Sequence, residues 1–509
     1  MALPVAGRTL APHPRPPGRT AAAPRLAALF LTAAALTVSC SRSETEATGR
    51  RIALTPCRVE GIEQQALCGT HEVFEDRAAK QGRKIALRIV VVPALASSPD
   101  PDPLVLLPGG PGQAASEMGP VLKMVDRIRR NRDIVLVDQR GTGASKPLEC
   151  NPDPPGAPLA AKFDDAYREE DFRACLGRYD ADPRFYTTPI AMDDLDEVRE
   201  ALGYEKLNLW GISYGTRAAL VYMRQHPEHV RTTMLDGVAP MNLLLPLYMP
   251  RDGQRALDLL FAHCEKDAGC ARAFPDLKSR VKTYLDGLEA APAKVTVAHP
   301  LTGAPEEITV SRYVFLQMIR GQLYMPELAA LVPLVLDRAT KGDYAPFVAL
   351  SLGVTGGMSA TIEHGMFYSV VCAEDAPFIT DEAIARESAG TWFGGKTVHD
   401  MLEPCRVWPR GTVPEGYRTP VASALPTLLL SGELDPVTPP SWGEEAKKTL
   451  SNSLHVTVPG VGHNTAMVDC VRSLMADFVK AGSLEGLKPA CGPELARPPF
   501  VTSFAGPMP

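Results

Sequence analysis

The sequence feature that most constrains the fold is a Gly-x-Ser-x-Gly stretch at residues 211–215. An apolar run too short for a helix, residues 207–210, precedes it, and a helical pattern at residues 216–225 follows. A strand, a sharp turn and a helix in this order form the context of a nucleophile elbow. The two glycines leave room for the strained backbone of such a turn. The motif alone also fits an ordinary strand-to-helix turn, but its flanks favour Ser213 as a nucleophile.

Short apolar runs alternate with helical patterns on both sides of this stretch. Several runs are uniformly apolar, which is typical of parallel strands covered on both faces. Residues from about 250 to 365 are instead mostly helical in pattern, with one hairpin-like pair. We therefore predict an α/β core in two parts, residues 56–245 and 411–509, interrupted by a mainly helical cap at 246–410. The predicted core strands are 104–107, 133–138, 207–210, 232–236, 427–430 and 454–458.

The N-terminus has the pattern of an export signal. Four arginines precede a 13-residue apolar run, residues 26–38, which suits a signal peptide and is short for a membrane span. Cys40 follows in a context similar to a bacterial lipobox, although Thr37 stands where leucine is usual. We predict a lipoprotein-type signal peptide at 1–40, lipidation at Cys40 and a tether at 41–55. The alternative is a soluble secreted protein cleaved nearby.

The cysteines fit the same compartment. Setting Cys40 aside leaves ten of the 11, and an exported chain can keep them as disulfides. Pairing in sequence order would close five local loops, although spacing alone does not fix the connectivity. No Cys/His cluster suggests a metal site. The predicted pairs are 57/68, 150/175, 264/270, 372/405 and 470/491.

Composition excludes one class of partner. The 509 residues carry a net charge of −6, so the chain has no global basic field for nucleic acid. The pattern requires no cofactor. If the N-terminal prediction holds, the protein meets the membrane through a lipid anchor only and resides in the cell envelope or is secreted. The sequence leaves the oligomeric state open.

A serine nucleophile needs a base and a group that orients the base. In this kind of core the acid and the histidine follow the serine. Asp435 comes just after the strand 427–430, and His463 follows the strand 454–458 through a glycine turn. Glu433 is an alternative acid. His455 lies inside a strand and is more typical of a structural residue, whereas His226 and His229 stand at a helix end.

An oxyanion hole requires backbone N–H groups aimed at the developing charge. One should be that of Tyr214, directly after the nucleophile. The other should come from the glycine-rich loop 109–112 after the strand 104–107, where Gly110 is the first candidate and Gly109 the second. A helical pattern at 116–130 follows this loop. A phosphate-binding loop is a weak alternative, since no Lys-Ser/Thr follows.

Three motifs in this order, Gly-Gly-Pro-Gly at 109–112, Asp-Gln-Arg-Gly-Thr-Gly-Ala-Ser at 138–145 and Gly-Ile-Ser-Tyr-Gly at 211–215, resemble the prolyl iminopeptidase group of α/β-hydrolases. The cysteine-bearing chain resembles the secreted tripeptidyl aminopeptidases more closely, and this likeness spans roughly residues 55–495. The resemblance implies an α/β-hydrolase fold with a mostly parallel central sheet, an inserted helical cap and a tripeptidyl aminopeptidase-like (TAP-like) C-terminal part. Pro108 departs from the histidine usual before Gly-Gly-Pro-Gly, which puts a preference for N-terminal proline in doubt.

An aminopeptidase must recognise a free α-ammonium, for which a carboxylate near the nucleophile is suited. The resemblance implies that an acid following Cys372 binds this amine. Glu374 is the first candidate and Asp375 the second. A helix cap or an exposed turn explains these acids equally well.

These expectations combine into a serine aminopeptidase that acts on peptides through an acyl-enzyme. Ser213, His463 and Asp435 would form its triad. A carboxylesterase or lipase with the same triad is the nearest alternative, and a non-catalytic binding module on the same fold is the second. The number of residues released, the side-chain preference and the physiological substrate are left open.

Overall fold

The structure is a computed structural model that describes residues 52–151, 157–164, 166–358, 362–489, 491–492 and 495–505. The predicted signal peptide at 1–40, its Cys40 and most of the tether at 41–55 lie outside these ranges. Within them, no helix combines the length and the apolar character needed to cross a membrane.

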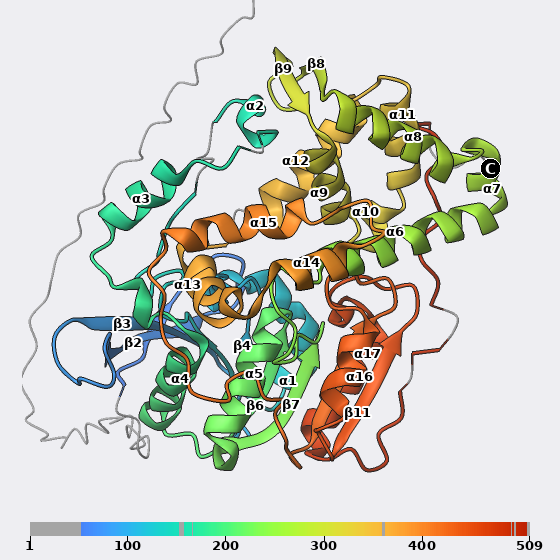
Figure 1. Ribbon diagram of the computed structural model, residues 1–509. Coiled ribbons are helices and arrows are strands. Elements are labelled where there is room, and N and C mark those ends of the chain that lie inside the picture. Colours follow the sequence, from blue (N-terminus) through green and yellow to red (C-terminus); the bar gives the residue numbers. More distant parts are fainter. Residues whose placement is uncertain are drawn as a thin grey trace, which may run out of the picture. The chain divides into compact units, whose positions relative to one another are not determined.

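A nine-stranded sheet forms the centre of the core, in the order β1-β2-β3-β5-β4-β6-β7-β10-β11 (Figure 1). Its parallel strands are β4 (Leu104–Leu107), β5 (Ile134–Val137), β6 (Leu207–Ile212), β7 (Val230–Asp236), β10 (Thr427–Gly432) and β11 (Ser453–Val458). An antiparallel edge is added by β1 (Thr55–Cys57), β2 (Ala66–Phe74) and β3 (Lys84–Val92). The prediction of an α/β fold with a mostly parallel sheet is confirmed.

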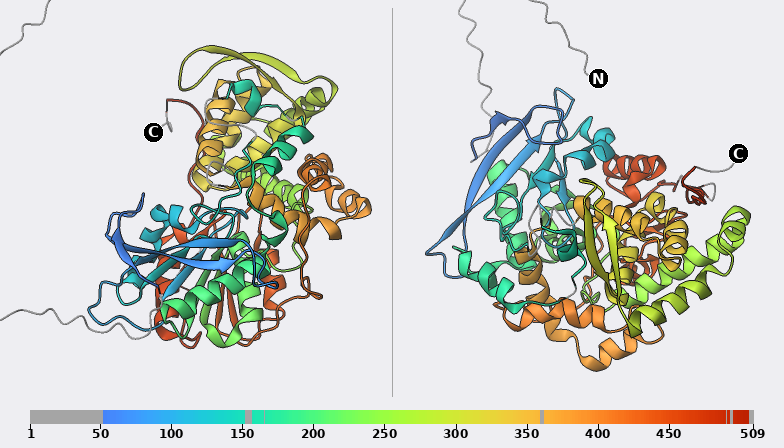
Figure 2. Two further views of the ribbon diagram at one scale, coloured as in Figure 1. Left: turned by 90° about the vertical axis from the view of Figure 1, so that its left-hand side faces the viewer. Right: turned by 90° about the horizontal axis from the view of Figure 1, so that it is seen from above.

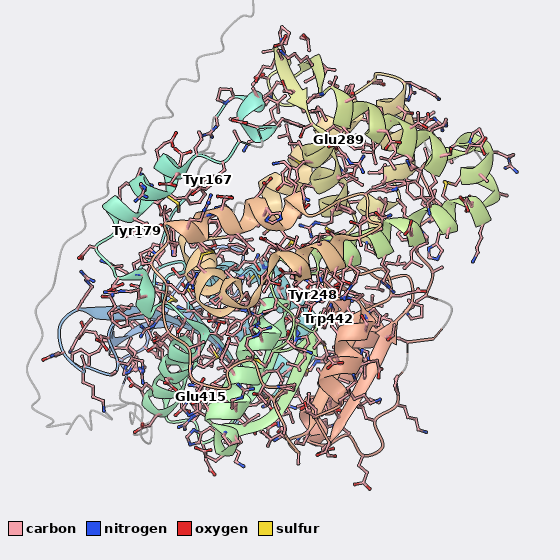
Figure 3. The ribbon with its side chains drawn as sticks, in the orientation of Figure 1. Tyr167, Tyr179, Tyr248, Glu289, Glu415 and Trp442 are labelled. Carbon is pink, nitrogen blue, oxygen red and sulfur yellow. A yellow bond between two sulfur atoms is a disulfide. The ribbon has the colours of Figure 1, made fainter. Side chains whose placement is uncertain are left out.

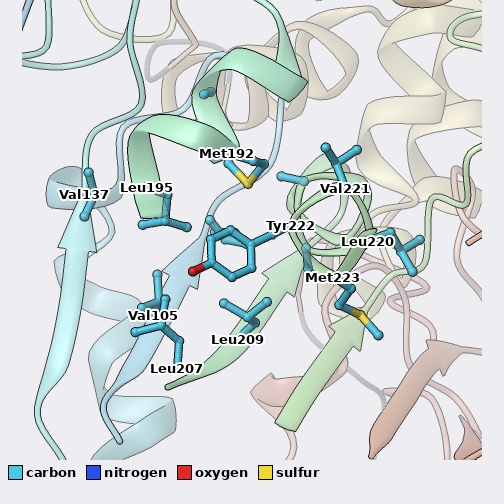
Figure 4. Close-up of a cluster of buried hydrophobic side chains, with 14 of the residues drawn as sticks. Val105, Val137, Met192, Leu195, Leu207, Leu209, Leu220, Val221, Tyr222 and Met223 are labelled. Atoms are coloured by element: carbon cyan, nitrogen blue, oxygen red, sulfur yellow. The ribbon is translucent and has the colours of Figure 1, made fainter. Parts of the chain in front are cut away.

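Both faces of the sheet are covered, because successive residues of a buried strand point to opposite sides. Leu207 and Leu209 of β6 pack toward α4 (Thr188–Leu202) and α5 (Tyr214–Gln225), beside the ring of Tyr222 (Figure 4). Trp210 and Ile212 face the other way, into the cluster that holds α17 (Asp469–Ala481). Each fully buried Leu, Ile or Val contributes roughly 1.5–3 kcal/mol. The apolar runs of the core strands are therefore explained by burial on two sides.

The predicted helix at 116–130 is not continuous. The segment forms two 3₁₀ turns and a short helix, η1 (Ala115–Glu117), η2 (Gly119–Val125) and α1 (Asp126–Arg129). Pro120 lacks the N–H that an α-helix interior requires, and Gly119 costs helix stability. Gly119 also packs directly on the backbone of Gly61, with which any Cβ would clash. The tight packing favours the broken helix.

A largely helical cap lies over the carboxyl ends of the parallel strands (Figures 1 and 2). Its residues 256–348 form a hydrophobic core that is separate from the two clusters flanking the sheet, whereas Met366 and Val370 of the cap belong to one of those clusters. Its elements are α6 (Met249–Lys266), α7 (Ala268–Ala273), α8 (Leu277–Ala290), the hairpin β8 (Ala293–Ala298) and β9 (Pro305–Val310), α9 (Arg312–Gln322), α10 (Pro326–Ala329), α11 (Val332–Thr340), α12 (Ala345–Met358), α13 (His364–Glu374), α14 (Asp381–Ser388) and α15 (Lys396–Leu402).

One segment from before the elbow also belongs to the cap core. Leu159 of α2 (Leu159–Lys162) and Phe163 are buried in the cap cluster, and the Phe163 ring lies 6.0 Å from that of Phe347. The remaining elements are α3 (Glu169–Arg178), α16 (Pro440–Lys447) and the 3₁₀ turns η3 (Pro183–Phe185), η4 (Pro227–His229), η6 (Ala376–Phe378), η7 (Glu403–Arg406) and η8 (Thr465–Met467). The core of the cap is thus assembled from three separate stretches of sequence, because Phe500 also belongs to this cluster.

The start of α6 joins the cap to the core through an aromatic pair. The rings of Tyr248 and Trp442 lie 4.9 Å apart (Figure 3). The indole N–H of Trp442 also donates to the buried carboxylate of Asp252, at 2.8 Å. The guanidinium of Arg251 lies over both rings.

The five predicted disulfides are confirmed. Each pair of cysteines closes a local loop of 6 to 33 residues, which restricts the unfolded chain. The bond between Cys372 and Cys405 holds the end of α13 against η7, close to Glu374. The pairs are Cys57–Cys68, Cys150–Cys175, Cys264–Cys270, Cys372–Cys405 and Cys470–Cys491.

Candidate active site

Ser213 occupies a strained turn between β6 and α5. Its φ of 56° and ψ of −124° place a non-glycine residue in a conformation that costs about 1–3 kcal/mol. Its backbone N–H donates to the carbonyl of Asp236, at the end of the neighbouring β7. The side chain is partly exposed, whereas the residues on both sides are buried. The turn therefore holds one hydroxyl clear of the sheet.

The two glycines of the motif are required by close packing. A Cβ on Gly215 would lie 1.9 Å from the carbonyl oxygen of Leu107, at the end of β4. A Cβ on Gly211 would lie 2.4 Å from the carbonyl oxygen of Gly215. The start of α5 thus packs directly against β4 and β6, which fixes the direction in which Ser213 points.

His463 and Asp435 meet beyond the ends of β11 and β10. Nδ1–H of His463 donates to Oδ2 of Asp435 at 2.7 Å, which leaves Nε2 as the acceptor nitrogen. Both side chains are buried. The imidazole also packs on Gly237, directly after Asp236, where a Cβ would lie 3.0 Å from Cε1 of the ring. His463 and Ser213 therefore contact adjacent residues at the end of β7.

The Asp435 carboxylate is held ionised. Burial alone would raise its pKa, but the charge of His463 and the hydrogen bonds lower it below the ordinary value. The N–H groups of Val437 and Thr438 donate to Oδ1 at 2.7 and 2.8 Å, and the Thr438 hydroxyl donates to Oδ2 at 2.8 Å. A fixed anion thereby orients the imidazole.

Glu433, the alternative acid, lies elsewhere. Its Oε2 accepts a hydrogen bond from the backbone N–H of Gly460 at 2.9 Å. Asp435 is the acid that reaches His463. Of the other histidines, His455 bonds to Ser431 and Glu444.

His226 and His229 lie with Asp196 at the end of α5. Ligand atoms of these three residues lie within 4.8 Å of one another. The Asp196 carboxylate already accepts hydrogen bonds from Arg199 and from the Tyr222 hydroxyl. The arrangement is that of a hydrogen-bonded surface cluster.

The glycine-rich loop lies directly beside the nucleophile. A Cβ on Gly109 would lie 3.2 Å from Cβ of Ser213. Gly110 has a φ of +107° and a Cβ there would lie 2.7 Å from the Gly112 nitrogen, so only glycine fits. On the other side of Ser213, Tyr214 opens α5, and the first N–H groups of a helix have no intrahelical partner. The backbone groups predicted for an oxyanion hole thus flank Ser213.

Glu374 lies beneath the elbow, fully buried at the end of α13. It accepts hydrogen bonds from the Thr188 backbone at 2.6 Å and the Thr188 hydroxyl at 2.9 Å, and from the Tyr417 hydroxyl. The Thr188 hydroxyl also lies 2.6 Å from the Tyr214 hydroxyl. Burial raises the pKa of Glu374, although the charge of Arg217 opposes this shift.

Asp375 is also fully buried and forms ion pairs with Arg217 at 2.8 Å and Arg418 at 3.0 Å. A substrate ammonium would have to displace protein partners to reach either carboxylate. A role for Glu374 or Asp375 in amine binding remains a prediction. In this structure the two acids support the base of the elbow, because Glu374 connects to Tyr214 through Thr188.

Sequence reasoning missed a half-buried carboxyl beside the glycine loop. The backbone N–H of Glu363 donates to the carbonyl of Gly112 at 3.0 Å. Burial, with the charges of Glu149 and Glu117, raises the pKa of its side chain to about 7. The residue lies at the start of α13, and no motif marks it, because only the fold brings it to the loop.

Sequence reasoning also missed a contact from the cap to the histidine. The backbone N–H of His463 donates to the carbonyl of Tyr324, just past α9, at 2.8 Å. The Tyr324 ring stands edge-on to the imidazole, with centroids 5.2 Å apart. Gly462 can carry no Cβ, which would lie 2.2 Å from the same carbonyl oxygen. The cap is therefore part of the histidine's surroundings.

The surroundings of His463 lead us to expect that the reactivity of Ser213 falls at low pH. Burial lowers the pKa of His463, but the charge and hydrogen bond of Asp435 raise it by more, so the pKa lies above its ordinary value. A base must be neutral, so reactivity should fall as pH falls through this raised pKa. We expect the rate of Ser213 labelling by a fluorophosphonate, which has no titrating amine, to show this fall. A midpoint at or below about 6.5, the ordinary imidazole value, would contradict it.

Two stretches of the chain match known families. Residues 102–264 match the family described as alpha/beta hydrolase fold, and residues 390–491 match the family described as TAP-like protein. The chain is 26% identical to serine protease Hip1 of Mycobacterium tuberculosis, over 87% of this chain and 91% of that protein. It is 25% identical to a tripeptidyl aminopeptidase of Streptomyces coelicolor, over 84% and 83%. A probable proline iminopeptidase of Streptomyces coelicolor is 34% identical, over 28% of this chain and 34% of its own length.

Proposed function

Because the chain belongs to the prolyl iminopeptidase and tripeptidyl aminopeptidase family of α/β-hydrolases, we propose that it is a serine aminopeptidase with Ser213, His463 and Asp435 as its triad. The observation that carries the proposal is the meeting of a strained serine turn with an Asp435–His463 pair at the end of β7. Peptides are the proposed substrates.

In the first half-reaction the Ser213 hydroxyl attacks the scissile carbonyl carbon. Nε2 of His463 takes the hydroxyl proton, and Asp435 stabilises the resulting imidazolium. The N–H groups of Tyr214 and of Gly110 or Gly109 stabilise the oxyanion. Each such donor is worth about 10²–10³ in rate. The C–N bond then breaks, and the imidazolium gives its proton to the leaving amine.

In the second half-reaction water replaces the leaving amine. His463 takes a proton from this water as the oxygen attacks the acyl carbon of the Ser213 ester. The tetrahedral oxyanion occupies the same backbone donors. The ester C–O bond breaks, the proton returns to the Ser213 oxygen, and the acid product leaves. The chemistry needs only groups of this chain and water.

The deciding experiment compares peptide amides that have a free N-terminus with the same peptides N-acetylated. An aminopeptidase binds the free ammonium, so the free substrates should be cleaved much faster. Ser213→Ala serves as the control for background hydrolysis. Equal rates on blocked and free peptides would refute the aminopeptidase, and fast hydrolysis of long-chain acyl esters without peptide cleavage would favour an esterase or lipase.

The amine site makes a separate prediction. The sequence-based candidates are Glu374 and Asp375, and the structure adds Glu363 beside the glycine loop. We expect Glu363→Gln to raise KM for free-amine peptides about tenfold or more, because a charge-assisted hydrogen bond is worth about 1.5–3 kcal/mol. The same KM should rise below about pH 7, where Glu363 becomes protonated.

Glu374→Gln is the comparison variant. Loss of the Glu374 carboxylate should instead lower the melting temperature, because the buried groups of Thr188 and Tyr417 lose an anionic acceptor. Fluorophosphonate labelling separates the two effects, since the probe has no amine and Glu363→Gln should leave its rate unchanged. A KM effect confined to Glu374→Gln would assign amine binding to Glu374.

We also propose export of the protein, with a lipid on Cys40 as its attachment to the cell envelope. The apolar run at 26–38 and the cysteine that follows support this, and so do five disulfides in the body of the chain. Metabolic labelling with a fatty-acid analogue tests it. Cys40→Ser should lose the label and appear in the soluble fraction.

A further inference from the structure

A pocket of about 490 Å³ lies where the cap, the core and the C-terminal segment, residues 495–505, meet. In Figure 1 this C-terminal segment, in red, runs from the core up toward the cap. Ser213, His463 and Asp435 are not among the residues of its wall. The wall comprises His263, Lys266 and Asp267 at the end of α6, Glu433 and Gly460 in the turns after β10 and β11, and residues 495–500.

Arg497 stands in this pocket with unused donors. All three of its guanidinium nitrogens are buried, and none has a hydrogen-bond partner in the described part of the chain. Nδ1 of His263 is buried and unpartnered in the same way. The Arg497 guanidinium lies 3.6 Å from the centre of the Phe500 ring, which leaves its N–H edges free. Buried donors without partners cost stability, so this arrangement favours a ligand that accepts hydrogen bonds.

The nearby acids are already engaged. Asp267 caps α7 through the backbone N–H of Cys270 at 2.7 Å, and Glu433 accepts from Gly460. Lys266 adds a second positive charge at the exposed rim. Burial lowers the pKa of Arg497 to about 10, so the guanidinium stays charged at neutral pH. The wall therefore carries two cations, Arg497 and Lys266, one neutral donor, His263, and two carboxylates that are bonded elsewhere and not to Arg497.

Contacts of the backbone hold the segment that carries Arg497 in place. Gly460, with a φ of +67°, can carry no Cβ, which would lie 2.6 Å from the Arg497 nitrogen. Further along, the N–H of Val501 donates to the carbonyl of Ala330 in the cap at 3.0 Å. The C-terminal segment is thus anchored to the core on one side of the pocket and to the cap on the other.

We propose that this pocket binds an oxyanion group, a phosphate or a carboxylate, between Arg497 and His263. A planar guanidinium suits both groups because it can donate two parallel hydrogen bonds. His263 donates from Nδ1 in the matching tautomer, and Lys266 adds attraction from the rim. The bound anion bridges the end of α6 in the cap to the C-terminal segment, which packs on Gly460 in the turn after β11.

The test titrates the full chain, as Ser213→Ala so that peptides stay intact, with sodium phosphate at constant ionic strength. We expect a saturable rise in melting temperature and a heat of binding in calorimetry, neither of which sodium chloride produces. Two further arms, a short peptide with a free C-terminal carboxylate and the same peptide amidated, distinguish the sources of the oxyanion. A response to the carboxylate form alone assigns a peptide end, and a response to phosphate alone assigns a free anion.

Arg497→Gln should weaken binding about tenfold or more, since a hydrogen bond to a charged group is lost. His263→Gln and Lys266→Gln act at separate places and should each weaken it less, which keeps the test valid if Arg497→Gln folds poorly. Arg173→Gln removes an exposed arginine of α3 and is the matched control. No saturable response to any oxyanion, or wild-type affinity in both Arg497→Gln and His263→Gln, would overturn the proposal.

Discussion

Replacement of Ser213 by alanine is expected to lower kcat for peptide hydrolysis by about 10⁶, the loss typical of removing a triad serine. The serine on the elbow turn is the group that forms the covalent intermediate. The variant should also lose all fluorophosphonate labelling. Its fold should be unchanged, because alanine removes only the oxygen from a partly exposed side chain.

Ser451→Ala is a suitable matched control, since it makes the same change at an exposed serine near β11. It should keep full activity and labelling. A Ser213→Ala protein that still cleaves peptides, or still takes the probe at one site, would remove Ser213 from the mechanism.

Asp435→Asn is expected to lower kcat by about 10⁴, because an amide can turn its NH₂ group toward the imidazole and favour the wrong tautomer. Such a variant keeps the size and most of the hydrogen bonds of Asp435. It should therefore remain folded, although the loss of the anion also lowers the pKa of His463, which the Asp435 charge raises.

Glu433→Gln is the matched control, because it makes the same acid-to-amide change two residues earlier in the chain. Its side-chain oxygen can still accept from Gly460, so kcat should stay within a factor of about two. Steady-state kinetics with one peptide amide and a melting curve for each variant complete the comparison. A larger loss in Glu433→Gln than in Asp435→Asn would exchange the roles of the two acids.

The sequence was sufficient for the parts of the site that sit at strand ends. In a parallel sheet the carboxyl ends of all strands lie at one edge, so Ser213, Asp435 and His463 could be expected together from local patterns alone. The glycines at 109–112 and 211–215 were informative for a similar reason. Each occupies a place where the backbone allows no Cβ, and this constraint is local.

Other features depend on contacts between distant segments. Glu374 meets Thr188 and Tyr417, which are 186 and 43 residues away, so its burial beneath the elbow leaves no local signature. Leu159 and Phe163 fall within the range 56–245 that was predicted for the core, yet their side chains belong to the hydrophobic cluster of the cap. Glu363 and Tyr324 carry no motif because the fold alone brings their backbones to the site.

The hydrogen bond between the His463 N–H and the carbonyl of Tyr324 has a consequence for exchanging caps between related hydrolases. The hydrogen bond uses main-chain atoms on both sides, so it does not depend on the side chain at residue 324, whereas the edge-on ring contact with the imidazole does. A transplanted cap must, however, end the helix equivalent to α9 at the position from which the following carbonyl reaches the His463 N–H. Chimeras should therefore tolerate wide sequence variation elsewhere in the cap and fail when a single residue is inserted or deleted just after α9.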